Sequence, residues 1–564
     1  MTGTVLVRGA RLPQPDGSLS EPLDLHVARG RIAAITRAGT RPGGGTGGTG
    51  TGDGGTGPDD AGQDVVGLPD GGHGGTAQDA VGLPDTGRPG DPGTPTLDAR
   101  GRVALPGFVD AHTHAEAAVF DPDVQLAMLR QGITTVVTGQ DGVSFAPSDR
   151  ATYDWASTYF AAIDGDHPVF TGGSVGDLLT TYHRTVPLNV AYLAPHGTLR
   201  YGVLGAAQRA ASDEEIAAMV RLLEQALDDG ACGLSTGLEY VPAAYADERE
   251  LVALAKVVAA RSLPHVSHMR GYEDRGAEGL AELVRIARAS GVATHVSHLH
   301  GPAHDLLEHV GAARAEGLDL TYDSYPYLRG CSILSMVSLP TWLPLADAAA
   351  TVAALRDPAL AGRLSDHFAG LTDLWPRITF ASVPGMEWAE GLTLPDVAAR
   401  LGRTAPDTVV EILTTTALRA SCVFAQPPTN SPESVRALAG YEGHLAGSDA
   451  IYRGGRPHPR GWGAFARFLD EHVRRGSWTW WDAAQHLSAR AARRFGLAGR
   501  GELVPGAVAD LVLVDAGRVR DEATYEQPRT PASGIEDVLV AGVPVLADGA
   551  LTGETPGRGL RPAP

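Results

Sequence analysis

From Leu105 onward the sequence alternates short apolar runs with helical segments, and this alternation restricts the fold more than any other feature. Eight of the runs are predicted to be strands, because apolar and β-branched residues cluster in them between turn signals. They are residues 107–114, 134–141, 189–196, 232–239, 264–270, 294–300, 319–327 and 444–449. Eight strands that alternate with helices predict an α/β fold, a TIM-like (β/α)8 barrel, whose active site lies at the C-terminal ends of the strands.

Metal-ligand side chains stand at several of these strand ends. His112 and His114 are two residues apart, so both imidazoles face the same side of a strand. His268 and His298 each follow a serine at the end of a later strand, and Asp449 ends the last one. Imidazoles and a carboxylate from separate strands are the ligand set of a catalytic zinc site. The sequence therefore predicts one or two divalent metal ions, Zn²⁺ or another divalent metal, at the barrel mouth.

The segments outside the barrel predict three further parts. Both chain ends carry short strand patterns, which we expect to form one small β-sandwich domain. Between them lies Gly-rich sequence in which Asp64-Val-Val-Gly-Leu-Pro-Asp recurs as Asp79-Ala-Val-Gly-Leu-Pro-Asp, and we expect a disordered insertion there. The interval from Tyr327 to His444 is too long for a connection, so it predicts an inserted helical subdomain before the last barrel strand.

These patterns divide the chain into expected domains. They are the β-domain's N-terminal part at 1–39 and 96–106, the Gly-rich insertion at 40–95, the barrel at 107–498 with an insert at about 340–440, and the β-domain's C-terminal part at 499–564.

Composition restricts the cellular compartment and the kinds of partner that we expect. The net charge of −20 argues against nucleic acid and anionic membranes, which both require a basic surface. The N-terminus lacks a signal-peptide pattern, and no apolar run reaches the length of a membrane span. We therefore expect a cytoplasmic protein that acts on a small molecule. Composition leaves the oligomeric state open.

Eight segments between Leu105 and Phe468 together resemble the amidohydrolase superfamily and, within it, the D-aminoacylase (N-acyl-D-amino-acid deacylase) branch. They are Pro106-Gly-Phe-Val-Asp-Ala-His-Thr-His114, His196-Gly-Thr-Leu-Arg200, Gly233-Leu-Ser-Thr-Gly-Leu-Glu-Tyr240, Ser267-His-Met-Arg270, Ser297-His-Leu299, Tyr325-Pro-Tyr327, Gly447-Ser-Asp449 and His458-Pro-Arg460-Gly-Trp-Gly463. The resemblance implies that His112 and His114 bind the more buried metal position, that His268 and His298 bind the second, and that Asp449 is the general base.

The sequence departs from the family pattern at three points. Many relatives bridge their metals with a carboxylated lysine, but the only lysine here is Lys256, in a predicted helix. The D-aminoacylase branch uses a cysteine after strand two, where this chain has Asp141; that carboxylate either ligates a metal or hydrogen-bonds near it. His300 stands where relatives often carry lysine, which puts one substrate contact in doubt.

The expected reaction is metal-dependent hydrolysis of an amide, and the resemblance adds that the substrate is an N-acyl-D-amino acid or a related N-acyl amine. A metal-activated hydroxide would attack the amide carbon with Asp449 as its base, while His196 would help to hold the oxyanion.

Substrate contacts are expected from a further group of side chains. Arg270 and Arg460 are candidates because a guanidinium grips a carboxylate at two points, although a structural ion pair would explain each of them as well. Tyr325, Tyr327 and His300 are expected at the pocket. Two alternatives remain: a cyclic-amide hydrolase of the hydantoinase or dihydroorotase kind, and a non-catalytic metal- or ligand-binding barrel.

Overall fold

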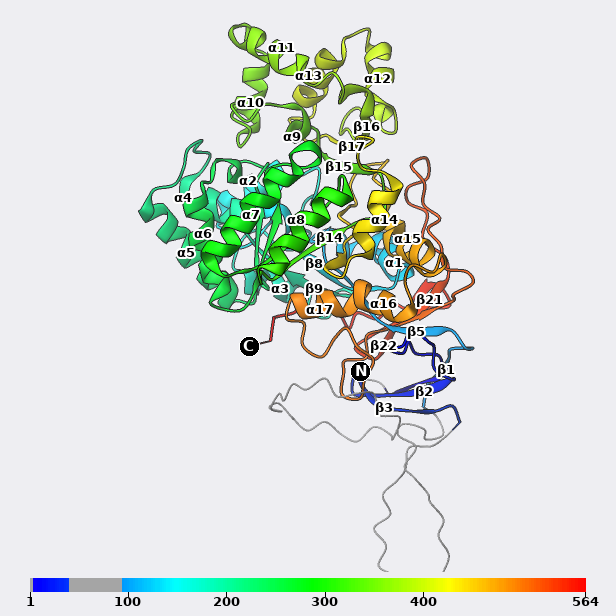
Figure 1. The fold of residues 1–564 in the computed structure, drawn as a ribbon. Helices are drawn as coiled ribbons and strands as arrows, with labels where there is room; N and C mark the ends of the chain where they lie inside the picture. The colour runs from blue at the N-terminus through cyan, green and yellow to red at the C-terminus, as the bar shows by residue number, and fades with distance from the viewer. Residues whose placement is uncertain (1–3, 40–93, 564) are drawn as a thin grey trace, which may run out of the picture.

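The protein is described by a computed structural model in which residues 4–39 and 94–563 are placed. The disorder predicted for residues 40–95 therefore falls almost wholly outside the described residues. Within them the chain forms a small β-domain, a barrel above it and an inserted subdomain over the opposite end of the barrel (Figure 1).

Eight parallel strand positions close into a barrel, as predicted. They are β6 (Phe108–Asp110) with β7 (Thr113–His114), β8 (Ile133–Thr138), β9 (Asn189–Tyr192) with β10 (Ala194–Pro195), β11 (Leu234–Gly237), β12 (Pro264–His268), β13 (Ala293–Val296), β14 (Leu320–Ser324), and β18 (His444–Ala446) with β19 (Ala450–Ile451). Neighbouring positions pair in parallel around the ring, and β19 pairs with β7, which joins the last strand to the first. All eight predicted strands are confirmed.

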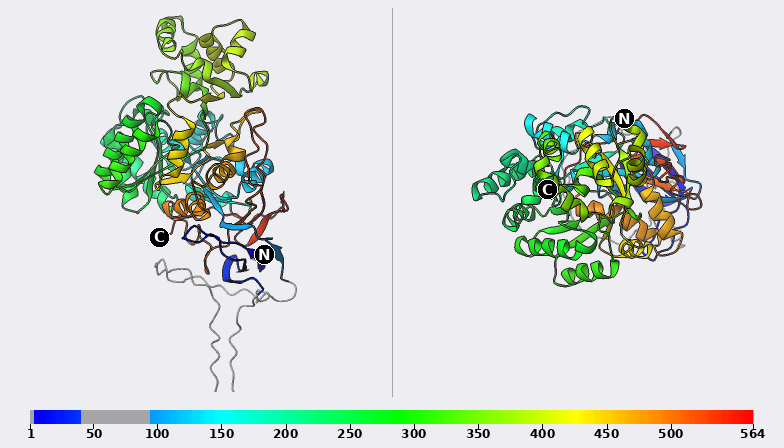
Figure 2. Two further views of the ribbon diagram at one scale, coloured as in Figure 1. Left: turned by 45° about the vertical axis from the view of Figure 1, so that its right-hand side comes forward. Right: turned by 90° about the horizontal axis from the view of Figure 1, so that it is seen from above.

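Helices surround the barrel, and Figure 2 shows them as an outer ring when the molecule is seen from above. They are α1 (Pro122–Arg130), α2 (Arg150–Tyr159), α3 (Val175–Thr181), α4 (His196–Leu204), α5 (Asp213–Asp228), α6 (Glu248–Ala259), α7 (Gly276–Ser290), α8 (Ala303–Ala315), α14 (Pro432–Gly440), α15 (Arg460–Phe468), α16 (Trp480–Ala484) and α17 (Arg490–Arg494). Helix α5 begins at the capping box of Ser212 and Glu215, in which each side chain accepts the other's backbone N–H. No helix in the placed part of the chain is long and apolar enough to cross a membrane.

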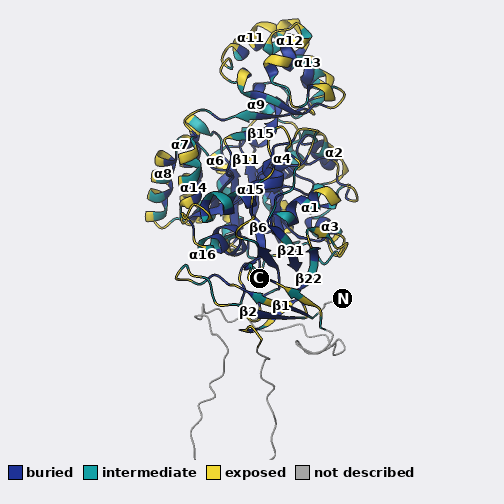
Figure 3. Ribbon diagram, turned by 90° about the vertical axis from the view of Figure 1, so that its right-hand side faces the viewer, coloured by how far each residue is buried: buried dark blue, intermediate teal, exposed yellow. Residues whose placement is uncertain are grey.

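Apolar side chains close the barrel at the end away from the insert. Val109, Val137 and Val266 from three strands belong to one buried cluster with Phe495, which follows α17. Figure 3 shows the strands as the most deeply buried layer of the molecule. Because this end is packed shut, we expect an accessible site at the other end of the strands.

The inserted subdomain follows β14 directly. It consists of β15 (Arg329–Ile333), α9 (Leu334–Ser338), α10 (Ala348–Leu355), α11 (Ala361–Ala369), β16 (Ile378–Ser382), α12 (Leu394–Leu401), α13 (Ala405–Thr415) and β17 (Ser421–Ala425). The subdomain is helical as expected, but it also contains an antiparallel sheet in the order β15-β17-β16 that stands over the barrel (Figure 1). No turn signal marks this sheet in the sequence, because β15 pairs with a strand almost a hundred residues later.

The two chain ends form the small β-domain. One sheet has the order β3-β2-β1-β4 and the other β23-β22-β21-β20-β5. Their strands are β1 (Val5–Ala10), β2 (Leu23–Ala28), β3 (Arg31–Arg37), β4 (Thr96–Asp98), β5 (Val103–Pro106), β20 (Leu511–Val514), β21 (Ile535–Val540), β22 (Val543–Ala547) and β23 (Ala550–Leu551). Side chains from both sheets share one buried core, so the domain is the predicted β-sandwich.

Candidate metal centre and active site

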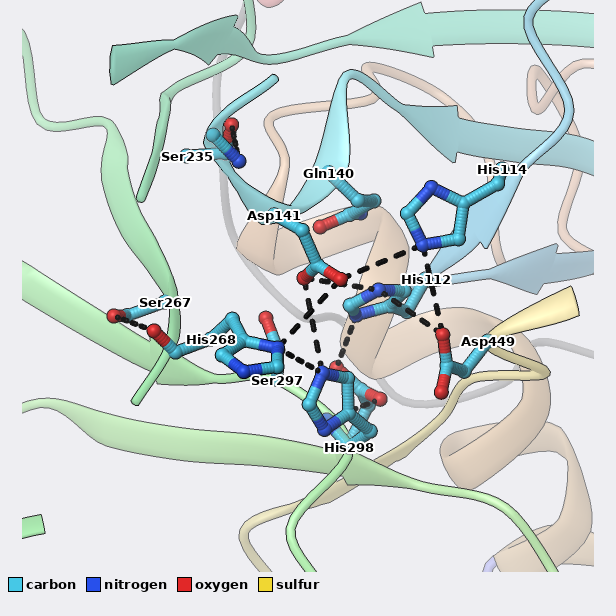
Figure 4. Close-up of polar contacts among 12 residues, drawn as sticks. His112, His114, Gln140, Asp141, Ser235, Ser267, His268, Ser297, His298 and Asp449 are labelled. Carbon is cyan, nitrogen blue, oxygen red and sulfur yellow. Dashed lines mark hydrogen bonds and ion pairs between the residues drawn. The ribbon is translucent and has the colours of Figure 1, made fainter. Parts of the chain in front are cut away.

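The first two predicted ligands, His112 and His114, leave strand β6–β7 at the mouth of the barrel. Both side chains are buried, and their Nε2 atoms each lie 3.5 Å from an oxygen of the Asp141 carboxylate. The side chain of Asp110, two residues earlier, accepts the backbone N–H of His112 at 3.3 Å. The two imidazoles therefore point toward one carboxylate (Figure 4).

Asp141 is the centre of the cluster. Its Oδ2 lies 3.6 Å from Nδ1 of His268, and its Oδ1 lies 3.7 Å from Nε2 of His298. The four histidines thus surround the carboxylate from two sides (Figure 4). They form two potential metal groups that share Asp141: one with His112, His114 and Asp449, the other with His268 and His298. Asp141 is therefore the residue common to both groups.

The backbone around Asp141 is unusual and fixes its side chain in this position. Asp141 has φ 55° and ψ 21°, the left-handed region that few non-glycine residues adopt. A Cβ atom at the preceding Gly139 would lie 2.4 Å from the carbonyl oxygen of Leu193, so the turn has no room for a larger residue. His298 and Asp449 also have positive φ, at 37° and 49°. Such strain gathers at functional sites.

Asp449 approaches the same imidazoles from the last barrel strand. Its Oδ1 lies 3.6 Å from Nε2 of both His112 and His114, while its Oδ2 is 2.8 Å from Nη1 of Arg460. Its backbone N–H donates to the carbonyl oxygen of His112 at 2.7 Å, which ties strand eight to strand one. One carboxylate oxygen is thus held by an arginine, and the other faces the metal-ligand cluster.

The charges in the cluster stabilise one another. Burial alone would raise the pKa of Asp141, but His268 and His112 outweigh it and hold that pKa well below its usual value. Burial would lower the pKa of His268, but the Asp141 and Glu239 carboxylates raise it to about 9. For Asp449, Arg460 and His298 overcome burial and lower the pKa. The carboxylates are therefore ionised at neutral pH, as metal ligands must be.

The cluster meets the requirements of a divalent metal site. His112 Nε2 and Asp141 Oδ1 are buried yet make no hydrogen bond to any described residue, although buried polar atoms almost always have a partner. Imidazole nitrogens and carboxylate oxygens suit zinc and other divalent first-row metals. A metal ion would give these atoms the partner that the protein does not supply.

Three further carboxylates lie beside ring nitrogens of the histidines. Asp323 Oδ2 is 3.4 Å from Nδ1 of His112, Asp164 Oδ1 is 3.4 Å from Nδ1 of His114, and Glu239 Oε2 is 3.0 Å from Nε2 of His268. Carboxylates in this position orient an imidazole and make it a better ligand. Asp323 and Asp164 were missed in the sequence. The end of strand β14 could have revealed Asp323, but Asp164 lies in a loop that carries no signal.

Replacing Asp323 by asparagine is expected to weaken metal binding about 10- to 100-fold, the usual effect of losing such a partner. Asp323 also accepts the backbone N–H of His298 at 2.9 Å and a bond from His295 Nε2 at 3.0 Å, so one charge supports both halves of the cluster. Calorimetric zinc titration of the metal-free variant measures the change. Asp366→Asn, on the exposed face of α11, is the control; equal affinity in both variants would contradict the role assigned to Asp323.

A cavity of about 280 Å³ opens over the cluster, and two of the predicted substrate residues, Tyr325 and His300, line it. The ring of His300 stacks on Tyr272 with an angle of 3° between the planes. Its Nδ1 donates to the carbonyl oxygen of His298 at 2.8 Å, and burial lowers its pKa to about 4. His300 is therefore uncharged at neutral pH, unlike the lysine that relatives often carry there.

Three predicted residues lie elsewhere, each held by another partner. His196 Nε2 is 2.7 Å from Glu250 Oε1 on α6. Arg270 pairs with Glu282 at 3.1 Å and donates to two backbone carbonyls, so each of its three guanidinium nitrogens already has a protein partner. The Tyr327 hydroxyl donates to Asp521 at 2.7 Å. None of the three lines the cavity.

Arg460, the other predicted carboxylate contact, lies behind the cavity wall. Its guanidinium is fully buried, pairs with Asp449, and stands 4.6 Å from the ring centre of Tyr325. Its position is that of a residue that orients the Asp449 carboxylate and supports the Tyr325 side of the cavity wall.

Comparisons with known proteins agree with this geometry. The sequence pattern of the amidohydrolase family matches residues 96–546. An N-acyl-D-glutamate deacylase and a D-aminoacylase, both of Alcaligenes xylosoxydans xylosoxydans, are each 34% identical to this chain and cover 82% of it, with 88% of their own length matched. The solved N-acyl-D-glutamate deacylase of Bordetella bronchiseptica, in complex with zinc and a phosphonate inhibitor, is 28% identical with a TM-score of 0.73, over 99% of both chains. The chain belongs to the amidohydrolase family.

Proposed function

We propose that this chain hydrolyses the amide bond of N-acyl-D-amino acids, releasing a carboxylate and a D-amino acid. The observation that carries the proposal is the Asp141 carboxylate surrounded by four histidines, with Asp449 beside two of them. The similarity to deacylases over most of the chain supports the substrate class. Its composition supports a cytoplasmic enzyme that acts on a small molecule without nucleic acid or membrane as partner.

The metal ligands that we propose are His112, His114, Asp141, His268 and His298, which would hold one or two divalent ions, zinc first. When bound, a divalent metal lowers the pKa of a coordinated water to about 7 and polarises the carbonyl oxygen of the amide. Asp141 contributes a hard oxygen where the D-aminoacylase branch has a thiolate, which widens the range of metals toward harder ions.

Asp449 is the proposed general base. Its Oδ1 faces the ligand histidines at 3.6 Å and is the oxygen placed to accept a proton from the attacking water. Arg460 holds Oδ2 at 2.8 Å, which fixes the orientation of the carboxylate and keeps it ionised. The same Oδ1 then returns the proton to the departing amine, so that the amide nitrogen leaves as a neutral group.

The experiment that tests this function compares linear and cyclic amides. Metal-loaded protein is incubated with a set of N-acetyl-D-amino acids and, separately, with hydantoins and dihydroorotate, and product formation is followed by chromatography. Release of amine from the linear substrates alone is the expected result. Ring opening without deacylation would overturn the proposal in favour of a cyclic-amide hydrolase, and no reaction in protein shown to hold metal would favour a binding protein.

A further inference from the structure

Part of the cavity wall is apolar. The inserted subdomain supplies most of it, so the sequence between β14 and β18 shapes the place where a substrate substituent would lie. The apolar side chains of this wall are Ile163, Met336, Val337, Leu374, Phe424 and Ile451. Apolar walls with few polar groups favour uncharged, apolar ligand surface.

The charged side chains beyond the metal cluster are mostly acidic. Among the described residues that line the cavity, Arg377 is the only arginine or lysine, whereas Glu239 and Glu273 both line it. Apart from the metal cluster, the lining therefore carries one positive and two negative charges.

The single cation is already compensated. Nη1 of Arg377 donates to the carbonyl oxygen of Ala425 at 2.9 Å and lies 3.7 Å from Oε1 of Glu273. Nε of Arg377 donates to the carbonyl oxygen of Asp373 at 3.2 Å. The pair joins the inserted subdomain to the loop after β12, and each side chain is about a quarter exposed, at 26% and 25%. A carboxylate on the substrate's side chain that approached Arg377 would meet Glu273 as well.

We propose that Glu273, by pairing with Arg377, is a specificity-determining residue that excludes acidic side chains and leaves the cavity to N-acyl-D-amino acids with uncharged, apolar side chains. This inference rests on the proposed deacylase function. The expected preference differs from that of two relatives, which are named N-acyl-D-glutamate deacylase and N-acyl-D-aspartate deacylase.

The physical reason is charge repulsion in a partly buried site. Like charges placed face to face weaken binding strongly, and proteins use them to reject the wrong partner. Glu239 does not relieve the repulsion, because its own carboxylate is negatively charged and faces His268 Nε2 at 3.0 Å. An apolar substrate side chain is not repelled by these carboxylates. It also buries apolar surface against the part of the cavity wall that the inserted subdomain supplies.

The test measures kcat/KM for N-acetyl-D-leucine, N-acetyl-D-methionine, N-acetyl-D-glutamate and N-acetyl-D-aspartate, with the acetyl group held constant. The wild type is expected to prefer the apolar pair by about 100-fold or more. In Glu273→Gln the ratio of D-glutamate to D-leucine activity is expected to rise by about tenfold or more, because Arg377 is no longer compensated.

Two further variants decide whether Arg377 is the cause. Glu273→Gln combined with Arg377→Gln should cancel the gain, and Arg377→Gln alone should lower the acidic substrates further. A wild type that prefers acidic side chains, or an unchanged ratio in Glu273→Gln, would overturn this inference while the deacylase function stands. Failure to cleave any D substrate would instead overturn the proposed function, and this inference with it.

Discussion

Replacing Asp449 by asparagine is expected to lower kcat/KM for amide hydrolysis by about 10²- to 10⁴-fold, the contribution of a general base. Asparagine keeps the shape of the side chain but cannot accept a proton. The backbone bond from Asp449 N–H to His112 remains possible, so the join between the last and first barrel strands should survive. Steady-state release of amine from an N-acetyl-D-amino acid measures the effect, with circular dichroism to confirm the fold.

The control must separate loss of the base from loss of metal, because Asp449 also lies within one of the two potential metal groups. Metal content per chain, measured by mass spectrometry of the elements, is therefore compared between Asp449→Asn and the wild type. Retained metal with lost activity supports the role of base. An Asp449→Asn enzyme with wild-type activity would contradict it.

Removing the central carboxylate is expected to have the second large effect. In Asp141→Ala all four histidines lose the group that lies between them, at 3.5 to 3.7 Å from each. Metal affinity should fall by more than about 100-fold, since losing a partner that only orients a ligand already costs 10- to 100-fold. Zinc titration by calorimetry and metal content per chain measure the loss, and activity should fall with it.

Asp141→Cys is the matched variant for this prediction. A thiolate restores a negatively charged ligand but is softer than a carboxylate, so binding should recover while the preference moves toward Zn²⁺ and Cd²⁺ and away from Mn²⁺. Competition titrations with these metals in both proteins measure the shift. If Asp141→Ala bound metal as tightly as the wild type, Asp141 would be a neighbour of the site and not a ligand.

Much of the fold could be predicted because the barrel repeats one local pattern. Each strand is a short apolar run that ends in polar residues, and the capping box of Ser212 and Glu215 marks a helix start directly. The sheet of the inserted subdomain could not be predicted, because Cys331 pairs with Val423, on a strand about ninety residues later in the sequence. Such pairing depends on the whole fold and leaves no local pattern.

The cluster of potential metal-ligand side chains could also be predicted from the repeated strand pattern. His112, His114, His268, His298 and Asp449 stand at strand ends, and a barrel brings all strand ends to one mouth. His196 and Arg270 also follow strands, but they contact Glu250 and Glu282 on the outer helices and do not line the cavity. The position of a residue at the end of a strand predicts that its side chain lies near the barrel mouth. The residue that it pairs with comes from a distant part of the sequence, so the pairing could not be predicted.

The stereochemical preference of the enzyme tests the central claim most directly. Metal-loaded protein is given N-acetyl-D-leucine and N-acetyl-L-leucine under the same conditions, and kcat/KM is measured for each. We predict release of leucine from the D enantiomer at a rate at least about 100-fold above that from the L enantiomer. Equal or faster cleavage of the L enantiomer, or none of either by protein that holds its metal, would contradict the claim.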